Sequence, residues 1–430
     1  MSDDTIPLPA DWKLTPFNEL ATYETGRTPA RAVARFWAAQ SAEGIPWISI
    51  RDMRPYAQVN QTAERISPTA LHEIFHNRIS KRGTLIMSFK LTIGRVATLD
   101  VDACHNEAII SIFPNSRINQ KYLEYFLSQV DYADYQDRAV KGNTLNQQKI
   151  DRIEVAEPPK LEQAKIAAVL WTIQKAIQVE GRLVSTARDM KQSSMCQLFT
   201  RGLRGEPQKE TDIGPIPQSW NVEPLEQLRE FLQYGTSTKC EYTQKGNPVI
   251  RIPNVMDGKI RADDLKWCEL SEREIESLAL EPGDVIFIRT NGVRDRVGTC
   301  AVYTGQPEHA LFASYLIRAR LKADKLDPDF LQYFTATAGG LAQLGGQASP
   351  AADGKFNVNT KTIDSVLVPL PKPDEQKEIA AILQTIDRKI SVHERKRAAL
   401  SDLFQTMLHQ LMSAQIRVDK LDIDTSEVAA

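Results

Sequence analysis

Apolar side chains near the end of the chain recur at alternating spacings of four and three residues, from about Pro373 to Met412. This spacing averages 3.5 residues, the period that keeps one seam of a helix facing a partner helix. Two positions of the seam, His393 and Arg397, are polar. The pattern predicts a long helix that pairs with another helix. Its predicted seam is Ile379, Leu383, Ile386, Ile390, His393, Arg397, Leu400 and Phe404.

A second copy of this segment lies earlier in the chain. LEQAKIAAVLWTIQKAI begins at Leu161 and DEQKEIAAILQTIDRKI begins at Asp374, 213 positions later. One such helix alone would indicate ordinary amphipathic packing, but the repeat favours two helices that pair with each other. The seam of the first copy is Ile166, Leu170, Ile173, Ile177, Glu180 and Val184. Full antiparallel overlap would place Glu180 opposite Arg397, and we expect an ion pair there that fixes the register.

The segments that precede the two long helices also repeat in the same order. Leu8–Trp12 is matched by Ile216–Trp220, and the turn Gly26-Arg27-Thr28-Pro29 by Gly235-Thr236-Ser237-Thr238. Ser67-Pro68 predicts the start of a short helix, with serine as the N-cap. Strand candidates rich in β-branched and aromatic residues occupy 45–50, 84–89 and 96–99, and the first and second of these recur at 248–252 and 283–287.

This organisation predicts an α+β fold with an internal pseudo-two-fold repeat. Two similar mixed α/β domains are separated by two long helices that pair as an antiparallel coiled coil. The predicted parts are residues 1–157, 158–205 (central helix), 206–369, 370–415 (C-terminal helix) and 416–430 (tail). We expect the glycine-rich segment from Gly339 to Gly354 to be a loop, and the acidic tail after Ile416 to be frayed.

Composition is that of an ordinary soluble protein. The 430 residues are 42% hydrophobic and 25% charged, and no apolar run approaches the ~18 residues of a membrane span. The first residues lack the basic and apolar regions of a signal peptide, and five scattered cysteines argue against a disulfide framework. We therefore expect a cytoplasmic protein. The net charge of −2 makes indiscriminate coating of nucleic acid implausible, although local basic faces remain compatible with it.

The starts of both long helices carry the most specific motifs. Pro159-Lys160-Leu161-Glu162-Gln163 is followed by Ile166-Ala167-Ala168, and Pro371-Lys372-Pro373-Asp374-Glu375-Gln376 by Ile379-Ala380-Ala381. With the Gly26 turn and Ile93-Gly94-Arg95-Val96-Ala97, these residues make nearly the whole chain resemble the specificity subunit of type I restriction–modification enzymes. The second turn departs from that pattern because it lacks the proline, and Arg294–Gly298 stands where the first half has Gly94–Ala97.

The resemblance implies a non-catalytic subunit without a cofactor. Each mixed domain would be a target-recognition domain that reads one half of a bipartite site in double-stranded DNA. The helices would set the gap between the halves and dock two methyltransferase subunits, and restriction/translocase subunits would join through the complex. Such a complex methylates DNA and restricts phage DNA, and it involves no membrane.

Candidate DNA contacts are polar and basic residues in the repeated turns and strand ends, since Arg and Lys bind guanine or phosphate and Asn and Gln can bind adenine. For each, an ordinary solvated surface residue is about as probable. In the first half they are Arg27, Thr28, Arg51, Lys90, Arg95, Lys141 and Asn143. In the second half they are Thr236, Ser237, Lys239, Arg251, Asn254, Arg289, Asn291, Arg294 and Lys355.

Parts of the sequence are also compatible with two other classes of function. His72-Glu73-Ile74-Phe75-His76 is a literal HEXXH, which on a helix could hold zinc with Glu73 as the general base of a peptidase. No third histidine follows at a supportive spacing, and the equivalent segment from Ser271 to Leu278 has none, so we expect no metal. The carboxylates of Asp374 and Glu375 fit a helix N-terminus better than a nuclease site. The other alternative is a coiled-coil scaffold that binds only protein.

Overall fold

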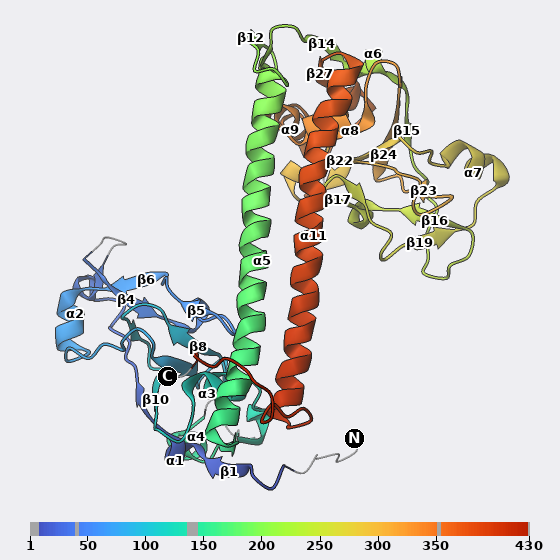
Figure 1. Ribbon diagram of the computed structural model, residues 1–430. Coiled ribbons are helices and arrows are strands. Elements are labelled where there is room, and N and C mark those ends of the chain that lie inside the picture. The colour runs from blue at the N-terminus through green and yellow to red at the C-terminus, as the bar shows by residue number, and fades with distance from the viewer. Residues whose placement is uncertain (1–7, 39–42, 136–144, 351–353, 429–430) are drawn as a thin grey trace. The chain divides into compact units, whose positions relative to one another are not determined.

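The computed structural model describes residues 8–38, 43–135, 145–350 and 354–428. The chain divides into two compact units, which we describe separately. Unit 1 comprises Met1–Gly181 and Glu394–Ala430, and unit 2 comprises Arg182–His393. The long helices α5 (Lys160–Arg201) and α11 (Pro373–Met412) each contribute one half to either unit (Figure 1). Both predicted helices are therefore present.

A five-stranded sheet forms the centre of unit 1. In spatial order its strands are β2 (Ala21–Thr25), β10 (Ile109–Pro114), β7 (Leu85–Ser88), β8 (Val96–Leu99) and β5 (Gln58–Val59). Neighbouring strands are antiparallel except for β5 and β8. Both faces are covered, since Leu85 and Met87 of β7 pack in one hydrophobic cluster and Ile86 packs in another. This alternation follows from the two-residue period of a strand.

Smaller elements complete unit 1. A four-stranded sheet has the order β3 (Trp37–Ala38), β6 (Glu64–Ile66), β4 (Ile45–Ile48) and β9 (Cys104–His105). Strand β1 (Lys13–Pro16) pairs with β11 (Glu154–Glu157). The short helices are α1 (Phe17–Leu20), α2 (Pro68–Glu73), α3 (Gln120–Leu127) and α4 (Gln147–Asp151), with 3-10 turns η1 (Ala34–Phe36), η2 (Ile50–Asp52) and η3 (Tyr132–Tyr135). As predicted, the Ser67 hydroxyl caps α2 by accepting from the Ala70 N–H at 3.1 Å.

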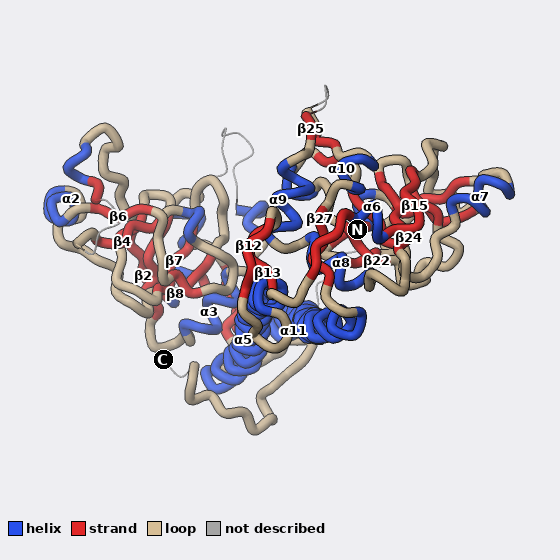
Figure 2. Tube along the Cα trace, turned by 90° about the horizontal axis from the view of Figure 1, so that it is seen from above, coloured by secondary structure: helices blue, strands red, loops and turns tan. Residues whose placement is uncertain are grey.

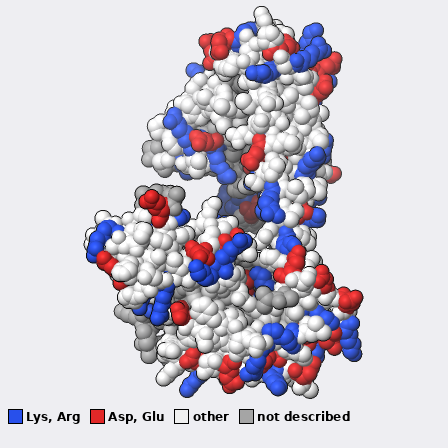
Figure 3. All heavy atoms as spheres, turned by 60° about the vertical axis from the view of Figure 1, so that its left-hand side comes forward, with Lys and Arg blue, Asp and Glu red and all other residues white. Residues whose placement is uncertain are grey.

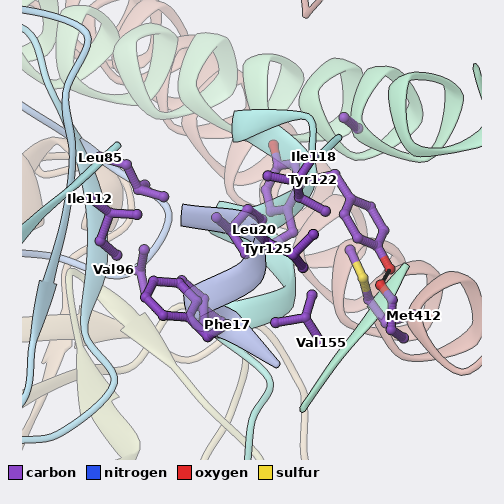
Figure 4. Packing of buried hydrophobic residues seen from close by; sticks show 14 of the residues in the cluster. Phe17, Leu20, Leu85, Val96, Ile112, Ile118, Tyr122, Tyr125, Val155 and Met412 are labelled. Atoms are coloured by element: carbon purple, nitrogen blue, oxygen red, sulfur yellow. Dashed lines mark hydrogen bonds between the residues drawn. The ribbon is translucent and has the colours of Figure 1, made fainter. Parts of the chain in front are cut away.

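The main core of unit 1 lies between the sheet and the helices. Figure 4 shows Leu85, Val96 and Ile112 of the sheet in the same cluster as side chains of α1 and α3, with Met412 of α11 also contributing. Tyr122 and Tyr125 of α3 are fully buried. Burying side chains of this size contributes roughly 1.5–3 kcal/mol each. Helix α3 therefore holds the sheet and the ends of α5 and α11 together in one hydrophobic cluster.

The two long helices are antiparallel within each unit. In unit 1, Ile166 and Leu170 from the start of α5 share a cluster with Phe404 and Leu408 from the end of α11. In unit 2, Phe199 from the end of α5 packs in the same hydrophobic cluster as Leu383 of α11. Figures 1 and 2 both show the helices side by side. The antiparallel pairing predicted from the seam is thus present in both units.

The ion pair expected at Glu180 differs in its partner. The Glu180 side chain is 4% exposed, and its carboxylate lies 2.6 Å from the Nζ atom of Lys396. The predicted partner, Arg397, is exposed. In unit 2, Lys191 meets Asp387 at 2.7 Å. Both pairs lie within one residue of the predicted register, and the discrepancy arises because a long lysine can reach the seam from a neighbouring position.

The remaining seam positions are buried to different degrees. Buried residues are Ile166, Leu170, Val184, Ile379, Leu383, Ile386, Ile390 and Phe404. Half-buried residues are Ile173, Ile177, His393 and Leu400.

Unit 2 repeats the topology of unit 1. Its six-stranded sheet has the order β15 (Arg229–Tyr234), β24 (Leu316–Leu321), β20 (Val285–Ile288), β22 (Cys300–Val302), β18 (Lys259–Ile260) and β17 (Val255–Met256). Strand β16 (Asn247–Ile250) pairs antiparallel with β19 (Lys266–Cys268) and parallel with β23 (Leu311–Phe312). Strand β4 has the same relation to β6 and β9 in unit 1, so the internal repeat extends to strand pairing.

The other elements of unit 2 include counterparts and additions. The counterparts are β14 (Asn221–Pro224), β27 (Leu367–Leu370), α6 (Leu225–Leu228), α7 (Glu272–Leu278), α8 (Pro328–Thr335), α10 (Thr360–Asp364) and η4 (Ile252–Asn254). The additions are the hairpin β12 (Gln208–Thr211)–β13 (Gly214–Pro217), the strands β21 (Thr290–Asn291), β25 (Ser349–Pro350) and β26 (Phe356–Asn357), η5 (Arg294–Arg296) and α9 (Ala338–Gly346).

One glutamine explains the repeated motif at the helix starts. The Oε1 atom of Gln163 accepts from the Asn119 N–H at 2.7 Å, and its Nε2 atom donates to the Pro158 carbonyl at 2.8 Å. Gln376 makes the same bonds in unit 2, accepting from the Asp327 N–H at 2.8 Å and donating to the Pro371 carbonyl at 3.0 Å. Both side chains are buried, so each amide joins the start of a long helix to the N-cap residue of a shorter helix in the same unit, Asn119 of α3 or Asp327 of α8.

Two expectations about irregular segments were wrong. The glycine-rich segment expected to be a loop contains the helix α9, capped by the Thr337 hydroxyl. The tail expected to fray is packed on unit 1, with Val418 and Val428 buried and the Lys165 ammonium donating to the Asp419 carbonyl at 2.7 Å. In both cases tertiary contacts outweigh a composition that is typical of flexible chain.

Candidate nucleic-acid interface

The repeated glycine turn occupies the same place in each unit. The Arg27 N–H donates to the His105 carbonyl at 2.8 Å, and the Thr236 N–H donates to the Phe312 carbonyl at 2.9 Å. A Cβ atom at Gly26 would overlap the His105 carbonyl oxygen, and a Cβ atom at Gly235 would overlap the Phe312 carbonyl oxygen. Because only glycine permits this approach, the two turns are equivalent despite the missing proline in the second.

Three candidate contacts of unit 1 surround the loop between β9 and β10. The Thr28 hydroxyl donates to the Glu107 carboxylate, and the Arg27 guanidinium donates to the Ile74 carbonyl at 2.7 Å. Lys90 is brought to the same loop because the neighbouring Phe89 N–H donates to the Ala108 carbonyl at 2.9 Å. Arg27, Thr28 and Lys90 therefore lie at one end of the five-stranded sheet.

Arg51 and Arg95 form a second group in unit 1. The Arg95 guanidinium donates to the carbonyls of Ile50 and Met53 at 3.2 and 3.4 Å, which places it against the turn η2 that contains Arg51. Arg51 is exposed and pairs with Glu64 at 2.7 Å. The remaining predicted contacts of this half, Lys141 and Asn143, lie outside the described residues.

In unit 2 the structure brings the turn and Arg289 together. The Arg289 guanidinium donates to the Ser314 carbonyl at 3.2 Å, and the Ser314 N–H donates to the Thr236 carbonyl at 2.8 Å. Ser237 and Lys239 of the same turn are exposed. This group matches the Arg27 group of unit 1 in position. Lys355 is exposed just before β26, away from the turn in sequence.

Several predicted contacts of unit 2 instead support the fold. Asn254 is 1% exposed, and its side chain accepts from the Arg251 N–H at 2.9 Å, so this side chain lies inside the fold and is not available to DNA. Arg294 donates to the Gly345 and Gly346 carbonyls, both at 2.9 Å, at the end of α9. Arg251 is bonded to Asp264, and the Asn291 side chain accepts from the Val293 N–H at 2.9 Å.

The residues of unit 2 that correspond to the Gly94-Arg95 turn differ from those that the sequence suggests. The Gly94 N–H donates to the Ser88 carbonyl at 2.9 Å, and the Gly298 N–H donates to the Ile288 carbonyl at 2.8 Å. Both glycines have positive φ. Gly298 is therefore the counterpart of Gly94, and Arg294 falls in an extra stretch of the second loop. The sequence alignment was misled because the second loop contains inserted residues, while the strands on either side of the loop still pair as they do in unit 1.

Sequence reasoning missed the exposed tyrosines near these groups. Tyr242 is 61% exposed, and the side-chain cations of Arg251 and Lys266 lie 5.8 and 4.9 Å from the centre of its ring. Tyr315 is 59% exposed beside the Arg289 group. Aromatic residues are usually expected in a core, so only their exposure identifies them, and exposure cannot be predicted from spacing.

Behind the Arg27 turn lies a cavity of about 370 Å³. Its lining includes Tyr23, Glu24, Arg27, Arg78, His105 and Ser111. The His105 Nε2 atom lies 2.8 Å from the Ser111 hydroxyl, and its Nδ1 atom lies 3.2 Å from the Asn106 carbonyl. Burial lowers the pKa of His105 from 6.5 to about 4, so the imidazole is neutral near pH 7 and supports the turn without adding charge.

The HEXXH motif does not have the geometry that zinc requires. Helix α2 ends at Glu73, and His76 has a φ of 51°, so His72 and His76 do not share a helical face. Glu73 forms a two-bond ion pair with Arg35 at 2.9 Å. Within the described residues, no group of three or more His, Cys, Asp or Glu side chains is placed to hold a metal ion. The peptidase alternative therefore has no structural support.

Charge on the molecular surface is mixed. Figure 3 shows basic and acidic side chains interspersed on the face that it draws, in agreement with the net charge of −2. None of the helices among the described residues has the length and apolar character needed to cross a membrane.

Comparison with known proteins agrees with these features. The family described as "Type I restriction modification DNA specificity domain" matches residues 9–185 and again residues 217–402. Each match covers one mixed domain and most of the long helix that follows it. The chain therefore belongs to the type I restriction–modification specificity family and carries its DNA specificity domain twice.

The individual relatives are distant, and the share of the chain that they match differs. The MjaVIII specificity subunit of Methanocaldococcus jannaschii is 22% identical, and the match covers 97% of this chain and 96% of that protein. The putative MjaX specificity subunit of the same organism is 28% identical over 48% of each chain. The crystal structure of a type I S subunit from M. genitalium has a TM-score of 0.60 at 12% identity, covering 95% of this chain and 98% of that one. This last similarity establishes the fold alone.

Proposed function

We propose that the chain recognises a bipartite site in double-stranded DNA, with one target-recognition domain for each half. The domains would comprise residues 1–157 and 206–369. The observation that carries the proposal is the repeated turn, since Gly26 and Gly235 present equivalent backbone beside polar side chains in two separate units. Two similar readers in one chain are suited to the two halves of a split site.

The long helices would set the spacer and dock partners. A helix of 42 residues such as α5 is roughly 60 Å long at 1.5 Å per residue, which is enough to separate two groove-reading surfaces by more than one turn of duplex. Two methyltransferase subunits would bind along the helices, and restriction/translocase subunits would join through them. Because the net charge is −2, we expect weak DNA binding until these partners add phosphate contacts.

In this assembly the chain would supply recognition without catalysis. Its candidate residues are hydrogen-bond donors and cations suited to bases and phosphates, and the methyl transfer would take place in the partner subunits. The complex would act on DNA in the cytoplasm.

Domain exchange tests the proposal directly. Residues 206–369 would be replaced by the equivalent domain of a relative with a different recognised sequence, and methylated motifs would be mapped across the host genome. We expect one half of the motif to change while the other half and the spacer stay the same. A change in both halves would refute independent reading.

A gel shift separates recognition from pure scaffolding. The chain with its methyltransferase partner should shift duplexes that carry the mapped motif, and shift scrambled duplexes far less. Assembly with the partner but equal binding to both duplexes would favour the protein-only scaffold.

A further inference from the structure

Leu91 is the most exposed large hydrophobic side chain in the described part of the chain, at 74%. One exposed leucine is ordinary by itself, but the backbone of Leu91 is also unusual, with a φ of 65°. Glycine and asparagine tolerate this region well, whereas leucine is strained there because its Cβ atom crowds the following carbonyl oxygen. Solvent and backbone therefore both disfavour the residue, which points to a role outside the fold.

The loop holds Leu91 in a fixed position. The Ser88 hydroxyl donates to the Thr92 carbonyl on the far side of Leu91 and accepts from the Arg95 N–H at 3.1 Å. The Ser88 N–H donates to the Arg95 carbonyl at 2.9 Å, which closes the loop at its base. A side chain presented by such a bonded loop loses little conformational entropy when it binds.

Leu91 also lies beside the candidate DNA contacts. It follows Lys90, and the same loop is bonded through Phe89 to Ala108, next to the Arg27 turn. Arg95 closes the loop on the other side. An apolar tip between cations suits a groove reader, because the cations can contact phosphates and position the protein while the tip contacts the base edges.

The corresponding loop of unit 2 has the same character. It is longer, yet it presents Val293 with 57% exposure, between Arg289 and Arg294. The Asn291 side chain accepts from the Val293 N–H at 2.9 Å and so fixes the tip. Two loops of different length and sequence each present one exposed aliphatic residue among basic residues.

We propose that Leu91 and Val293 are specificity-determining contacts that pack against the 5-methyl group of a thymine in the major groove. That methyl is the apolar group by which the major groove distinguishes thymine. Each half of the recognised site would then contain an A·T pair at the contacted position. The inference rests on the proposed function, since it assigns a base to each of the two reading domains.

The test uses the full chain with its methyltransferase partners, on duplexes that carry the mapped motif. Each thymine is replaced in turn by deoxyuridine, which lacks only the methyl group, and binding is measured by fluorescence anisotropy. For the wild type, one replacement in the half-site read by unit 1 should weaken binding by about threefold to tenfold, as expected for one buried methyl. Leu91→Ala should bind the normal duplex more weakly by a similar factor and be insensitive to that replacement.

Two further variants separate contact from folding. Leu91→Asn suits the positive φ better, so it should unfold no more easily than the wild type while losing the response to deoxyuridine. Leu14→Ala alters an exposed leucine of β1 in the same unit and should keep both affinity and response. Val293→Ala should remove the response to one deoxyuridine in the other half-site only.

Three results would overturn the inference. The first is a half-site without an A·T pair, and the second is a Leu91→Ala complex that keeps every deoxyuridine response. The third concerns 2-aminopurine placed in the duplex: if its fluorescence shows that the wild type unstacks the DNA and that Leu91→Ala does not, Leu91 is a wedge between base pairs. Failure of the proposed function looks different, because the wild-type complex would then methylate no bipartite motif.

Discussion

His105 shows how a single buried residue links the reading turn to pH. Its ring lies under the Arg27 turn, bonded to Ser111 and Asn106, and burial lowers its pKa from 6.5 to about 4. The unfolded chain therefore binds a proton between these values that the folded chain does not. Stability contributed by the neutral ring is present above pH 6.5 and is lost as the pH falls toward 4.

We predict that His105→Gln reduces the pH dependence of unfolding. Between pH 7 and pH 5 the wild type should lose about 2 kcal/mol from this residue, and the variant should not. Urea unfolding followed by tryptophan fluorescence at both pH values measures the difference. His409→Gln, at an exposed position of α11, is the matched control and should keep the wild-type pH dependence. An equal pH dependence in His105→Gln and the wild type would contradict the prediction.

At this scale the sequence predicts some residues and not others. Gly26 and Gly235 could be paired because the need for glycine is local. Asn254 was mistaken for a surface group, and the bonds of the exposed Arg294 were not foreseen, since the partners at Asp263 and Gly345 are brought to these residues only by the fold. Tyr242 and Leu91 were missed because apolar residues are normally assigned to a core.

Among the elements, periodicity predicted the long helices well because the seam is a property of the sequence itself. The prediction for the tail was wrong because a few residues within an acidic segment anchor it. The Arg417 guanidinium donates to the Glu162 carboxylate at 2.6 and 2.7 Å and to the Asp11 carboxylate at 2.7 and 3.1 Å. Glu162 is 2% exposed and also accepts from the Trp12 indole at 3.2 Å.

We predict that Arg417→Met destabilises unit 1 by roughly 2–4 kcal/mol, since it removes the cation that faces a buried carboxylate. Chemical denaturation measures the loss, and limited digestion with chymotrypsin, whose cleavage depends on neither Arg417 nor Lys420, should remove the end of the tail faster. Lys420→Met changes an exposed cation of the same tail and should leave both measurements unchanged. Unaltered stability in Arg417→Met would contradict the prediction and would mean that burial of Val418 and Val428, with the bond from Lys165 to Asp419, suffices to hold the tail.

For the whole molecule, the internal repeat was predictable because order and spacing survive while loops diverge. The helices α5 and α11 each supply one half to each unit, so unit 1 is built from two separate pieces of chain, Met1–Gly181 and Glu394–Ala430, while unit 2 is the continuous piece between them. No pattern within one half reveals this division. It follows from antiparallel pairing, which brings the start of one long helix to the end of the other.

The division suggests a test of the helices as a ruler for the spacer. We predict that seven residues inserted after Gly181 and seven after His393 lengthen the spacer of the recognised motif and leave both half-sites unchanged. A heptad keeps the seam in phase and adds ~10 Å at 1.5 Å per residue, which corresponds to about three base pairs at 3.4 Å each. Three pairs also rotate the groove by roughly 100°, so binding should weaken. Methylome mapping measures the spacer.

Insertion of four residues at the same points is the control, since it breaks the seam and should abolish methylation or leave no defined spacer. An active heptad variant with the original spacer would mean that partner subunits fix the distance, and that the helices serve only to hold the domains in one chain.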